Sequence, residues 1–301
     1  MADRQSQLPA IGSAFAGKYK LIQLLRSGGL AHVYLAERLP SGLGAGDDPP
    51  RFRPSERPGS APRIALKVLR RELAKDPAIV RRFERGVTAA SRVTHPNVAQ
   101  LGPLERAPDG TPFCTMELLV GLDLADTLAD AGRLGPLRAA RIAEGVASAL
   151  VAAHERGVVH LDVKPENVFL VHRSDGGEDV KLIDFGLASH FGETRPEASD
   201  ACGTPEYMAP EQRRGVTADP RMDVFALGLV LREMLTGEPP GSDAPLPIDV
   251  PARLVRLIRR ATAREPSERF ASMADMAASL LVAIEEMNAA GGVIRGGGAP
   301  L

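Results

Sequence analysis

Two short segments of this chain, separated by a hairpin-length gap, carry side chains that suit one kind of chemistry. The first holds Asp162, Lys164 and Asn167, and the second begins at Asp184. An aspartate in such a loop can orient a hydroxyl nucleophile, and a nearby lysine can meet a phosphate group during its transfer. The amide oxygen of Asn167 and the carboxylate of Asp184 are ligands that suit Mg²⁺. Together the two segments indicate phosphoryl transfer.

The elements that must position these residues change in character along the chain. Strand-like runs cover residues 19–25, 32–36 and 63–69, and the first two flank a glycine turn, which predicts a hairpin. Asp76 followed by Pro77 predicts the start of a helix. From residue 122 onward helical patterns dominate. The sequence therefore predicts an α+β fold in which a small strand-rich half precedes a larger helical half.

The expected boundaries follow these changes in pattern. We expect a flexible segment over residues 1–18, a strand-rich domain over 19–119, a helical domain over 120–288 and a flexible tail over 289–301. Within the strand-rich domain, residues 40–62 are rich in proline, glycine and charge, which is typical of a disordered insertion. The helical domain has helical patterns over 138–156, 224–236, 252–263 and 272–286.

Composition excludes several classes of protein. The chain has 301 residues, of which 44% are hydrophobic, and its net charge of -1 gives no basis for binding nucleic acids or anionic membranes. Its two cysteines are too few for a disulfide framework and favour a reducing, cytoplasmic setting. The apolar runs are too short to span a bilayer, and the first residues do not form a secretory signal. We therefore expect a cytoplasmic chain without a membrane segment.

The octet from His160 to Asn167 resembles the catalytic loop of protein kinases, and the triplet from Asp184 to Gly186 resembles their metal-binding motif. Lys164 is typical of kinases that act on serine and threonine, and residues 202–211 closely resemble the bacterial members of that type. The resemblance implies a two-lobed kinase fold, ATP and Mg²⁺ as cofactors, and a protein substrate with Ser or Thr. The implied roles are acceptor of the hydroxyl proton for Asp162, contact to the γ-phosphate for Lys164, and ligands of Mg²⁺ for Asn167 and Asp184.

The same resemblance assigns a nucleotide site to the strand-rich half. Lys67 matches the strand lysine that contacts the α- and β-phosphates. Met116 falls at the gatekeeper position, and the backbones of Glu117 and Leu119 are implied to bond an adenine base. The remaining positions implied to contact the nucleotide are Gly28, Gly29, Val33 and Ala65.

Several positions depart from the family pattern in this half. The family pairs its strand lysine with a helix glutamate, and here that position is Gly86. Glu84 lies two residues away, which is the opposite face of a helix. Arg26 and Ala31 replace two glycines of the phosphate-binding turn, and only Gly28 is kept in register. The loss of the glutamate puts the orientation of Lys67 in question, and the loss of the two glycines does the same for phosphate binding by the turn.

Residues 184–211 resemble an activation segment. The resemblance implies that Thr204 helps to place the substrate hydroxyl, and that Glu211 forms a buried ion pair with Arg269. Asp223 is implied to anchor the backbone of the catalytic loop. Self-association that supports autophosphorylation is a further implication.

Leu161 stands where the family usually has an arginine that receives the phosphate of a modified activation segment. Three hydroxyl residues of the segment remain candidates for modification: Ser189, Thr194 and Ser199. Because the receptor is missing, we predict that activity depends little on their phosphorylation.

Three functions are compatible with these residues. The first is an ATP- and Mg²⁺-dependent serine/threonine protein kinase, since all groups that touch phosphate, metal or hydroxyl are present. The second is a pseudokinase that binds nucleotide or acts as a scaffold, because Gly86, Leu161 and the altered glycine turn depart together. The third is a kinase of small molecules, against which Lys164 and the activation segment argue. All three share one fold, so the fold does not separate them.

Overall fold

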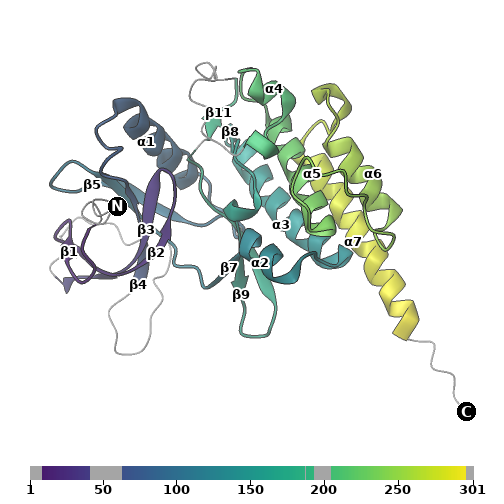
Figure 1. The fold of residues 1–301 in the computed structure, drawn as a ribbon, viewed down its shortest axis with the longest axis horizontal. Helices are drawn as coiled ribbons and strands as arrows, with labels where there is room; N and C mark the ends of the chain where they lie inside the picture. Colours follow the sequence, from purple (N-terminus) through teal and green to yellow (C-terminus); the bar gives the residue numbers. More distant parts are fainter. Residues whose placement is uncertain (1–8, 41–62, 187, 193–204, 296–301) are drawn as a thin grey trace, which may run out of the picture. The chain divides into compact units, whose positions relative to one another are not determined.

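The computed structural model describes residues 9–40, 63–186, 188–192 and 205–295, and its chain forms two compact units. Unit 1 comprises Met1–Thr94 and Ala99–Val120, and unit 2 comprises His95–Val98 and Gly121–Leu301. Unit 1 is rich in strands and unit 2 is mostly helical (Figure 1), so the predicted α+β class is confirmed. Most of the predicted insertion at 40–62 lies outside the described residues.

Unit 1 is built on an antiparallel sheet of six strands in the order β1-β2-β3-β4-β6-β5. The strands are β1 (Ala14–Phe15), β2 (Tyr19–Ser27), β3 (Ala31–Arg38), β4 (Arg63–Leu69), β5 (Leu101–Arg106) and β6 (Pro112–Met116). The predicted hairpin is the β2–β3 pair, in which Ser27 lies opposite His32 across the glycine turn.

One helix, α1 (Pro77–Ser91), packs against β5 in unit 1. The Asp76 side chain caps it by accepting a hydrogen bond of 2.8 Å from the Ala78 backbone N–H. The predicted helix start is therefore confirmed. The helix buries Phe83 and Val87, which lie four residues apart and so share one face.

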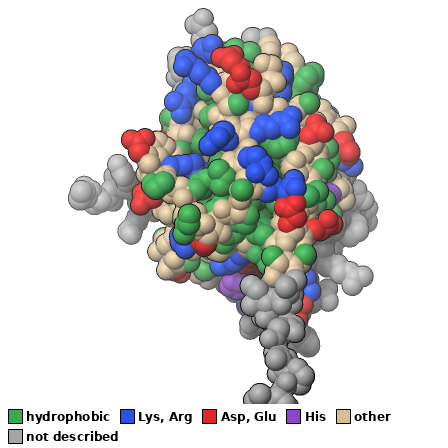
Figure 2. Space-filling model, turned by 90° about the vertical axis from the view of Figure 1, so that its right-hand side faces the viewer, with side chains coloured by type: hydrophobic (Ala, Val, Ile, Leu, Met, Phe, Trp, Pro, Cys, Tyr) green, Lys and Arg blue, Asp and Glu red, His purple; other side chains and the backbone are tan. Residues whose placement is uncertain are grey.

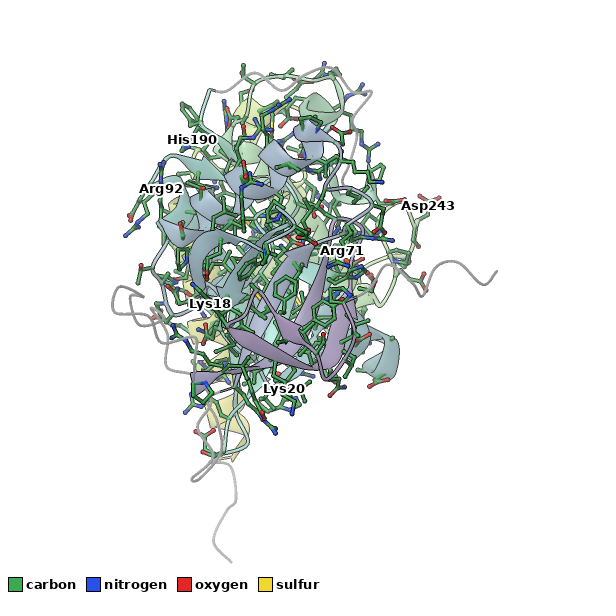
Figure 3. The ribbon with its side chains drawn as sticks, turned by 90° about the vertical axis from the view of Figure 1, so that its left-hand side faces the viewer. Lys18, Lys20, Arg71, Arg92, His190 and Asp243 are labelled. Atoms are coloured by element: carbon green, nitrogen blue, oxygen red, sulfur yellow. The ribbon has the colours of Figure 1, made fainter. Side chains whose placement is uncertain are left out.

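The core of unit 1 lies on one face of its sheet. It includes Tyr34, Leu66 and Phe113, which are almost completely buried, and the ring of Phe15 meets that of Phe113 edge-on at 5.1 Å between centroids. At the rim, Lys18 pairs with Glu105 of β5 at 3.0 Å; Figure 3 labels Lys18. Residues on the opposite face of β3 and β4 do not belong to this core.

Unit 2 contains the remaining helices and strands. Its helices are α2 (Leu124–Ala131), α3 (Pro136–His154), α4 (Pro210–Arg213), α5 (Pro220–Thr236), α6 (Ala252–Ala261) and α7 (Met273–Arg295), with 3₁₀ turns at Pro165–Asn167, Pro205–Tyr207 and Pro266–Glu268. Its strands are β7 (Gly121–Asp123), β8 (Val158–Val159), β9 (Val168–His172), β10 (Glu178–Leu182) and β11 (Ser189–His190).

The helix α3 is the centre of unit 2, and it packs against α5, α7 and β10. Its approach to β10 depends on Gly145, because a Cβ at this position would lie 2.9 Å from the Cβ of Val180. The sheets of unit 2 are small, with strand orders β10-β9-β7 and β11-β8. Within the described residues, no helix is both long and apolar enough to cross a membrane.

The helix ends differ from the predicted ranges mainly at α7. This helix continues to Arg295, beyond residue 288, although it includes Gly291 and Gly292. Each glycine in a helix interior costs about 1 kcal/mol relative to alanine, but extending a formed helix needs no new nucleus. Continuation of α7 is therefore less costly than the glycines alone suggest.

Candidate active site

The predicted proton acceptor, Asp162, is held by its neighbours in the loop before β9. Its Oδ2 atom accepts a hydrogen bond of 3.0 Å from Asn167 Nδ2 and lies 3.1 Å from Lys164 Nζ. Asn167 Nδ2 also donates to the Asp162 carbonyl at 2.8 Å. Within the described part of the chain both side-chain partners engage Oδ2, so Oδ1 is the oxygen positioned to accept a proton from an incoming hydroxyl.

Strand pairing brings the two predicted Mg²⁺ ligands together. In the β9–β10 pair, Val168 lies opposite Leu182, so the next residues outward are Asn167 and Ile183. The Ile183 N–H donates to the Asn167 carbonyl at 2.9 Å, and Asp184 follows directly. Because Nδ2 of Asn167 is committed to Asp162, its amide oxygen points elsewhere. An amide oxygen beside a carboxylate fits Mg²⁺, which takes oxygen ligands.

The ring of His160 joins the catalytic loop to the Asp184 segment. Its Nδ1 accepts a hydrogen bond from the Asp162 N–H at 3.3 Å, and its Nε2 lies 3.2 Å from the Ile183 carbonyl. These partners require a proton on Nε2 and none on Nδ1. The ring also packs on Phe185, with 4.6 Å between centroids. His160 and Phe185 are both buried, so the two segments share one small core.

Two residues of the site adopt backbone conformations that are rare outside glycine. The φ angle is 65° at Leu161 and 60° at Asp184. Strain of this kind persists only where the surroundings hold it. At Leu161 the N–H donates to Asp223 Oδ1 at 2.8 Å and the carbonyl accepts from Gln212 Nε2 at 2.8 Å.

Asp223, at the start of α5, anchors the catalytic loop as predicted. Its Oδ2 accepts hydrogen bonds from the His160 N–H at 2.9 Å and from His154 Nε2 at 2.7 Å. The carboxylate is fully buried. Burial favours the neutral acid, but the hydrogen bonds and charge of His154, helped by His160, outweigh it and hold the pKa of Asp223 below its ordinary value. The anchor therefore acts as an anion.

The side chain of Leu161 is also buried, with 4% of its surface exposed. It belongs to an apolar cluster, the Leu161 cluster, with Val159, Ala209, Ala218 and Met222, against which Phe225 packs. Ala209 directly precedes α4, and Met222 lies in α5. Hydrophobic contact thus joins the catalytic loop to the segment before α4, at the position where the family pattern has an arginine.

The predicted nucleotide residues of unit 1 share one face of its sheet. Val33 lies opposite Lys67 in the β3–β4 pair, and Ala65 lies opposite Met116 in the β4–β6 pair. Directly opposed residues point to the same face, and so do Ala65 and Lys67, which are two apart on β4. The core residue Leu66 takes the opposite face. Lys67 is 9% exposed.

The glycine turn between β2 and β3 is tight. Gly28 donates its N–H to the Ala31 carbonyl at 2.9 Å, and a Cβ on Gly28 would lie 3.2 Å from that oxygen. Gly29 has open space around it. Only small residues let a backbone approach a phosphate closely at such a turn.

At the helix position predicted to lack its glutamate, Gly86 is buried in α1. The nearest acidic side chain, Glu84, forms an ion pair with Arg106 of β5. The Glu84 carboxylate is therefore committed to a partner on the sheet.

The predicted adenine-binding segment follows β6. The Glu117 N–H donates to the Gln100 carbonyl at 2.9 Å, and the Glu117 carboxylate accepts from the Gln100 N–H at 3.2 Å. Among the described residues, no backbone hydrogen bond involves Leu119. The chain is thus fixed at Glu117, and the polar groups of Leu119 are available to a ligand.

The end of the activation segment is described only in part. Thr204, Thr194 and Ser199 lie outside the described residues, whereas Ser189 pairs with Val159 in the β11–β8 ladder. The predicted Glu211–Arg269 ion pair is confirmed, with nitrogen–oxygen distances of 2.6 and 2.8 Å.

A small cavity of about 250 Å³ adjoins the catalytic loop at Pro165 and Glu166. Its wall includes Tyr207 and Glu233, whose side chains form a hydrogen bond of 2.6 Å with the tyrosine as donor. Burial raises the pKa of Glu233, and the Glu166 carboxylate adds to the rise against the effect of the tyrosine. A cationic side chain placed here would relieve this repulsion.

Sequence reasoning missed the contributions of His154 and Gln212. His154 bonds Asp223, which anchors the loop, and Gln212 bonds the loop itself, and in each case the partner lies more than 50 residues away in the chain. The sequence favours a structural or surface role for His154, and the structure makes it structural. No local pattern distinguishes Gln212 from any other glutamine near a helix start.

Comparison with known proteins gives consistent matches. Residues 57–289 match the family described as "Protein kinase domain". The chain is 34% identical over 287 residues to the serine/threonine-protein kinase pkn3 of Myxococcus xanthus, which is 87% of this chain and 49% of that protein. It is 30% identical to PrkC of Bacillus subtilis, over 91% of this chain and 42% of that protein. The chain therefore spans about half or less of the length of these curated relatives.

Solved structures give the same result at the level of the fold. The kinase domain of PknI from Mycobacterium tuberculosis matches with a TM-score of 0.66 and 30% sequence identity. The match covers 91% of this chain and 98% of that domain.

Proposed function

Because this chain belongs to the protein kinase family and resembles bacterial serine/threonine kinases in sequence and fold, we propose that it transfers the γ-phosphate of ATP to a Ser or Thr hydroxyl of a protein. The observation that carries the proposal is the arrangement at Asp162. Its Oδ2 is held by Asn167 and Lys164, which presents Oδ1 to a hydroxyl.

In this reaction Asp162 Oδ1 accepts the proton of the substrate hydroxyl while the hydroxyl oxygen forms a bond to the γ-phosphorus of ATP. The bond between the γ-phosphorus and the β-phosphate oxygen breaks, and ADP leaves. Lys164, while bonded to Asp162, also offers its positive charge to the transferred group. Asn167 and Asp184 would hold Mg²⁺, which when bound neutralises charge on the phosphates. We assign Thr204 the role of orienting the hydroxyl, on the resemblance alone.

In unit 1, we propose that the sheet face with Val33, Ala65, Lys67 and Met116 contacts the nucleotide. Lys67 would supply charge to the phosphates, and the backbones of Glu117 and Leu119 would bond the adenine. Gly28 and Gly29 would cover the phosphates. The buried position of the Cys114 thiol is consistent with the reducing cytoplasm that we propose. A signalling role and self-association for autophosphorylation complete the proposal.

The test is transfer of labelled phosphate from ATP to a generic basic protein and to the chain itself. Asp162→Asn should lower the rate by about 100-fold or more, because the amide cannot accept the proton. Asp175→Asn is the matched control, since Asp175 lies in the exposed turn between β9 and β10 and should leave the rate unchanged. Equal rates for wild type and Asp162→Asn would contradict the proposal.

A pseudokinase is the second candidate, and the commitment of Glu84 to Arg106 beside the buried Gly86 is the observation that favours it. A chain of this kind would gain thermal stability from ATP with Mg²⁺, as any ligand of the folded state provides, without transferring phosphate. Stabilisation without transfer would therefore select this alternative.

A further inference from the structure

Unit 2 has a second and larger cavity whose wall includes no residue of the catalytic loop, although Glu206, Met208 and Pro210 at the end of the activation segment line it. Its volume is about 410 Å³, and it lies between the residues before and in α4, the middle of α5 and the loop that follows α5. Neither the phosphoryl-transfer chemistry nor the nucleotide contacts proposed above use it.

The floor of this cavity is apolar and firmly held. Met208, Phe225 and Leu229 contribute to it, and the Arg269 guanidinium lies 4.8 Å from the centre of the Phe225 ring. The loop that forms one side is tied to α5, because Arg232 donates to the Ser242 and Ala244 carbonyls at 2.8 and 2.7 Å. A floor and wall fixed in this way form a preshaped hollow for an apolar side chain.

The rim of the cavity is basic. Three arginines line it, Arg213, Arg214 and Arg264, against a single acidic residue, Glu206. Arg213 donates to the Pro205 carbonyl. Arg214 and Arg264 are exposed, and among the described residues neither side chain has a carboxylate partner.

The rim of the cavity therefore carries more positive than negative charge, although the chain as a whole is nearly balanced. The chain has nearly equal numbers of basic and acidic residues, and some of its arginines pair with carboxylates, as Arg138 does with Glu178 and Arg253 with Glu286. Figure 2 shows Lys and Arg side chains interspersed with hydrophobic ones over the upper half of one face. Positive charge without internal compensation around an apolar hollow is complementary to an acidic partner.

We propose that this cavity is a docking site for an acidic segment of a partner protein, which inserts one bulky apolar side chain over Phe225 and Leu229 and places carboxylates on Arg214 and Arg264. The apolar contact supplies affinity, and the charges supply orientation and a faster association. None of the residues to which we assign proton acceptance, metal binding or nucleotide contact lines the site, so binding does not require these residues.

Fluorescence anisotropy with the full chain tests this. The probe is a labelled peptide in which one leucine is flanked by aspartates on both sides. Two control peptides replace the aspartates by asparagines or the leucine by serine. On the protein, Arg214→Glu with Arg264→Glu is compared with Arg256→Glu and Arg259→Glu, two exposed α6 residues outside the cavity wall that give the same change in net charge.

We expect saturable binding that weakens about tenfold or more in the Arg214/Arg264 variant and stays within about twofold in the α6 control. Binding should weaken with added salt and be lost with either control peptide. The control peptides need no protein variant, so the result stands even if the double variant unfolds.

Four outcomes would overturn the proposal. They are no saturable binding of the leucine–aspartate peptide, equal binding of the leucine-to-serine peptide, equal loss in the α6 control, or a concentration-dependent dimer that only the Arg214/Arg264 variant abolishes. The last would show that a second copy of this chain is the occupant, and sedimentation velocity measures it.

Discussion

Replacing Asp223 by asparagine should damage the fold and the activity together. Asparagine has the same shape, but it has one acceptor oxygen and a donor NH₂ in place of two acceptor oxygens. Asp223 Oδ2 accepts from His154 and His160, and Oδ1 accepts from the Leu161 N–H. If the amide oxygen takes the Oδ2 position, its NH₂ faces the Leu161 N–H.

The size of the effect follows from these contacts. An unsatisfied buried N–H costs about 1–3 kcal/mol, and the remaining two hydrogen bonds lose their charge assistance. The free energy of unfolding should therefore fall by about 3–5 kcal/mol, which is the usual cost of removing one partner from a buried charged pair. The strained backbone of Leu161 then keeps only one of its two hydrogen bonds, the one from Gln212, so Asp162 should lose its position and turnover should fall about tenfold or more.

Urea denaturation followed by circular dichroism gives the free energy of unfolding, and labelled phosphate transfer gives turnover. Asp219→Asn is the matched control, because Asp219 caps the same helix by accepting from the Arg221 N–H at 2.8 Å, asparagine is an equally good cap, and the partly exposed ion pair with Arg221 that the change removes contributes at most about 1 kcal/mol. The reasoning is refuted if Asp223→Asn unfolds within about 1 kcal/mol of the control and keeps full turnover.

Acid should weaken the fold through Asp223, because its pKa in the folded protein lies below the ordinary value of 3.8. The stability that Asp223 contributes is present above pH 3.8 and is lost as the pH falls through the lower folded pKa. The free energy of unfolding, measured in urea, should therefore fall less steeply with acid in Asp223→Asn than in wild type. Leu161→Ala should lower the free energy of unfolding by about 2–4 kcal/mol, because it removes a buried side chain from an apolar cluster; a loss below about 1 kcal/mol in the same urea assay would count against that packing. Phosphatase treatment, and Ser189→Asp separately, should each leave turnover within tenfold of the untreated wild type, since Leu161 cannot bind a phosphate, and a larger change in the transfer assay would show that another receptor exists. Glu211→Gln should cost about 3–5 kcal/mol, and adding Arg269→Met should cost less than the sum of the single changes, so an additive double variant would argue against a coupled buried pair.

The local parts of the site could be predicted from the sequence. Asp162, Asn167 and Asp184 lie in short motifs flanked by strand-like residues, and strand pairing next to those motifs is enough to bring Asn167 and Asp184 together. The shared sheet face of Lys67 and Ala65 follows equally from alternation along one strand. Where the arrangement of side chains depends on neighbours in the chain, residue type and spacing were sufficient to predict it.

The contacts that hold the loop could not be predicted in the same way. Gln212 and His154 act through single hydrogen bonds across long stretches of chain, and an isolated polar residue carries no periodic signal. The extent of α7 depended on a balance between glycine cost and helix continuation, which sequence pattern does not weigh. The catalytic and binding roles assigned to individual residues rest on the family resemblance, because residue type and spacing alone do not establish them.

The Leu161 cluster gives the catalytic loop an unusual dependence on the conditions around it. Apolar contacts have little dependence on ionic strength, unlike an arginine bound to a phosphate, and they weaken on cooling because their driving force near room temperature is entropic. The loop should therefore keep its shape in salt concentrations that would dissociate an exposed ion pair. Cooling should therefore disorder the catalytic loop more readily than removal of a phosphate by a phosphatase does.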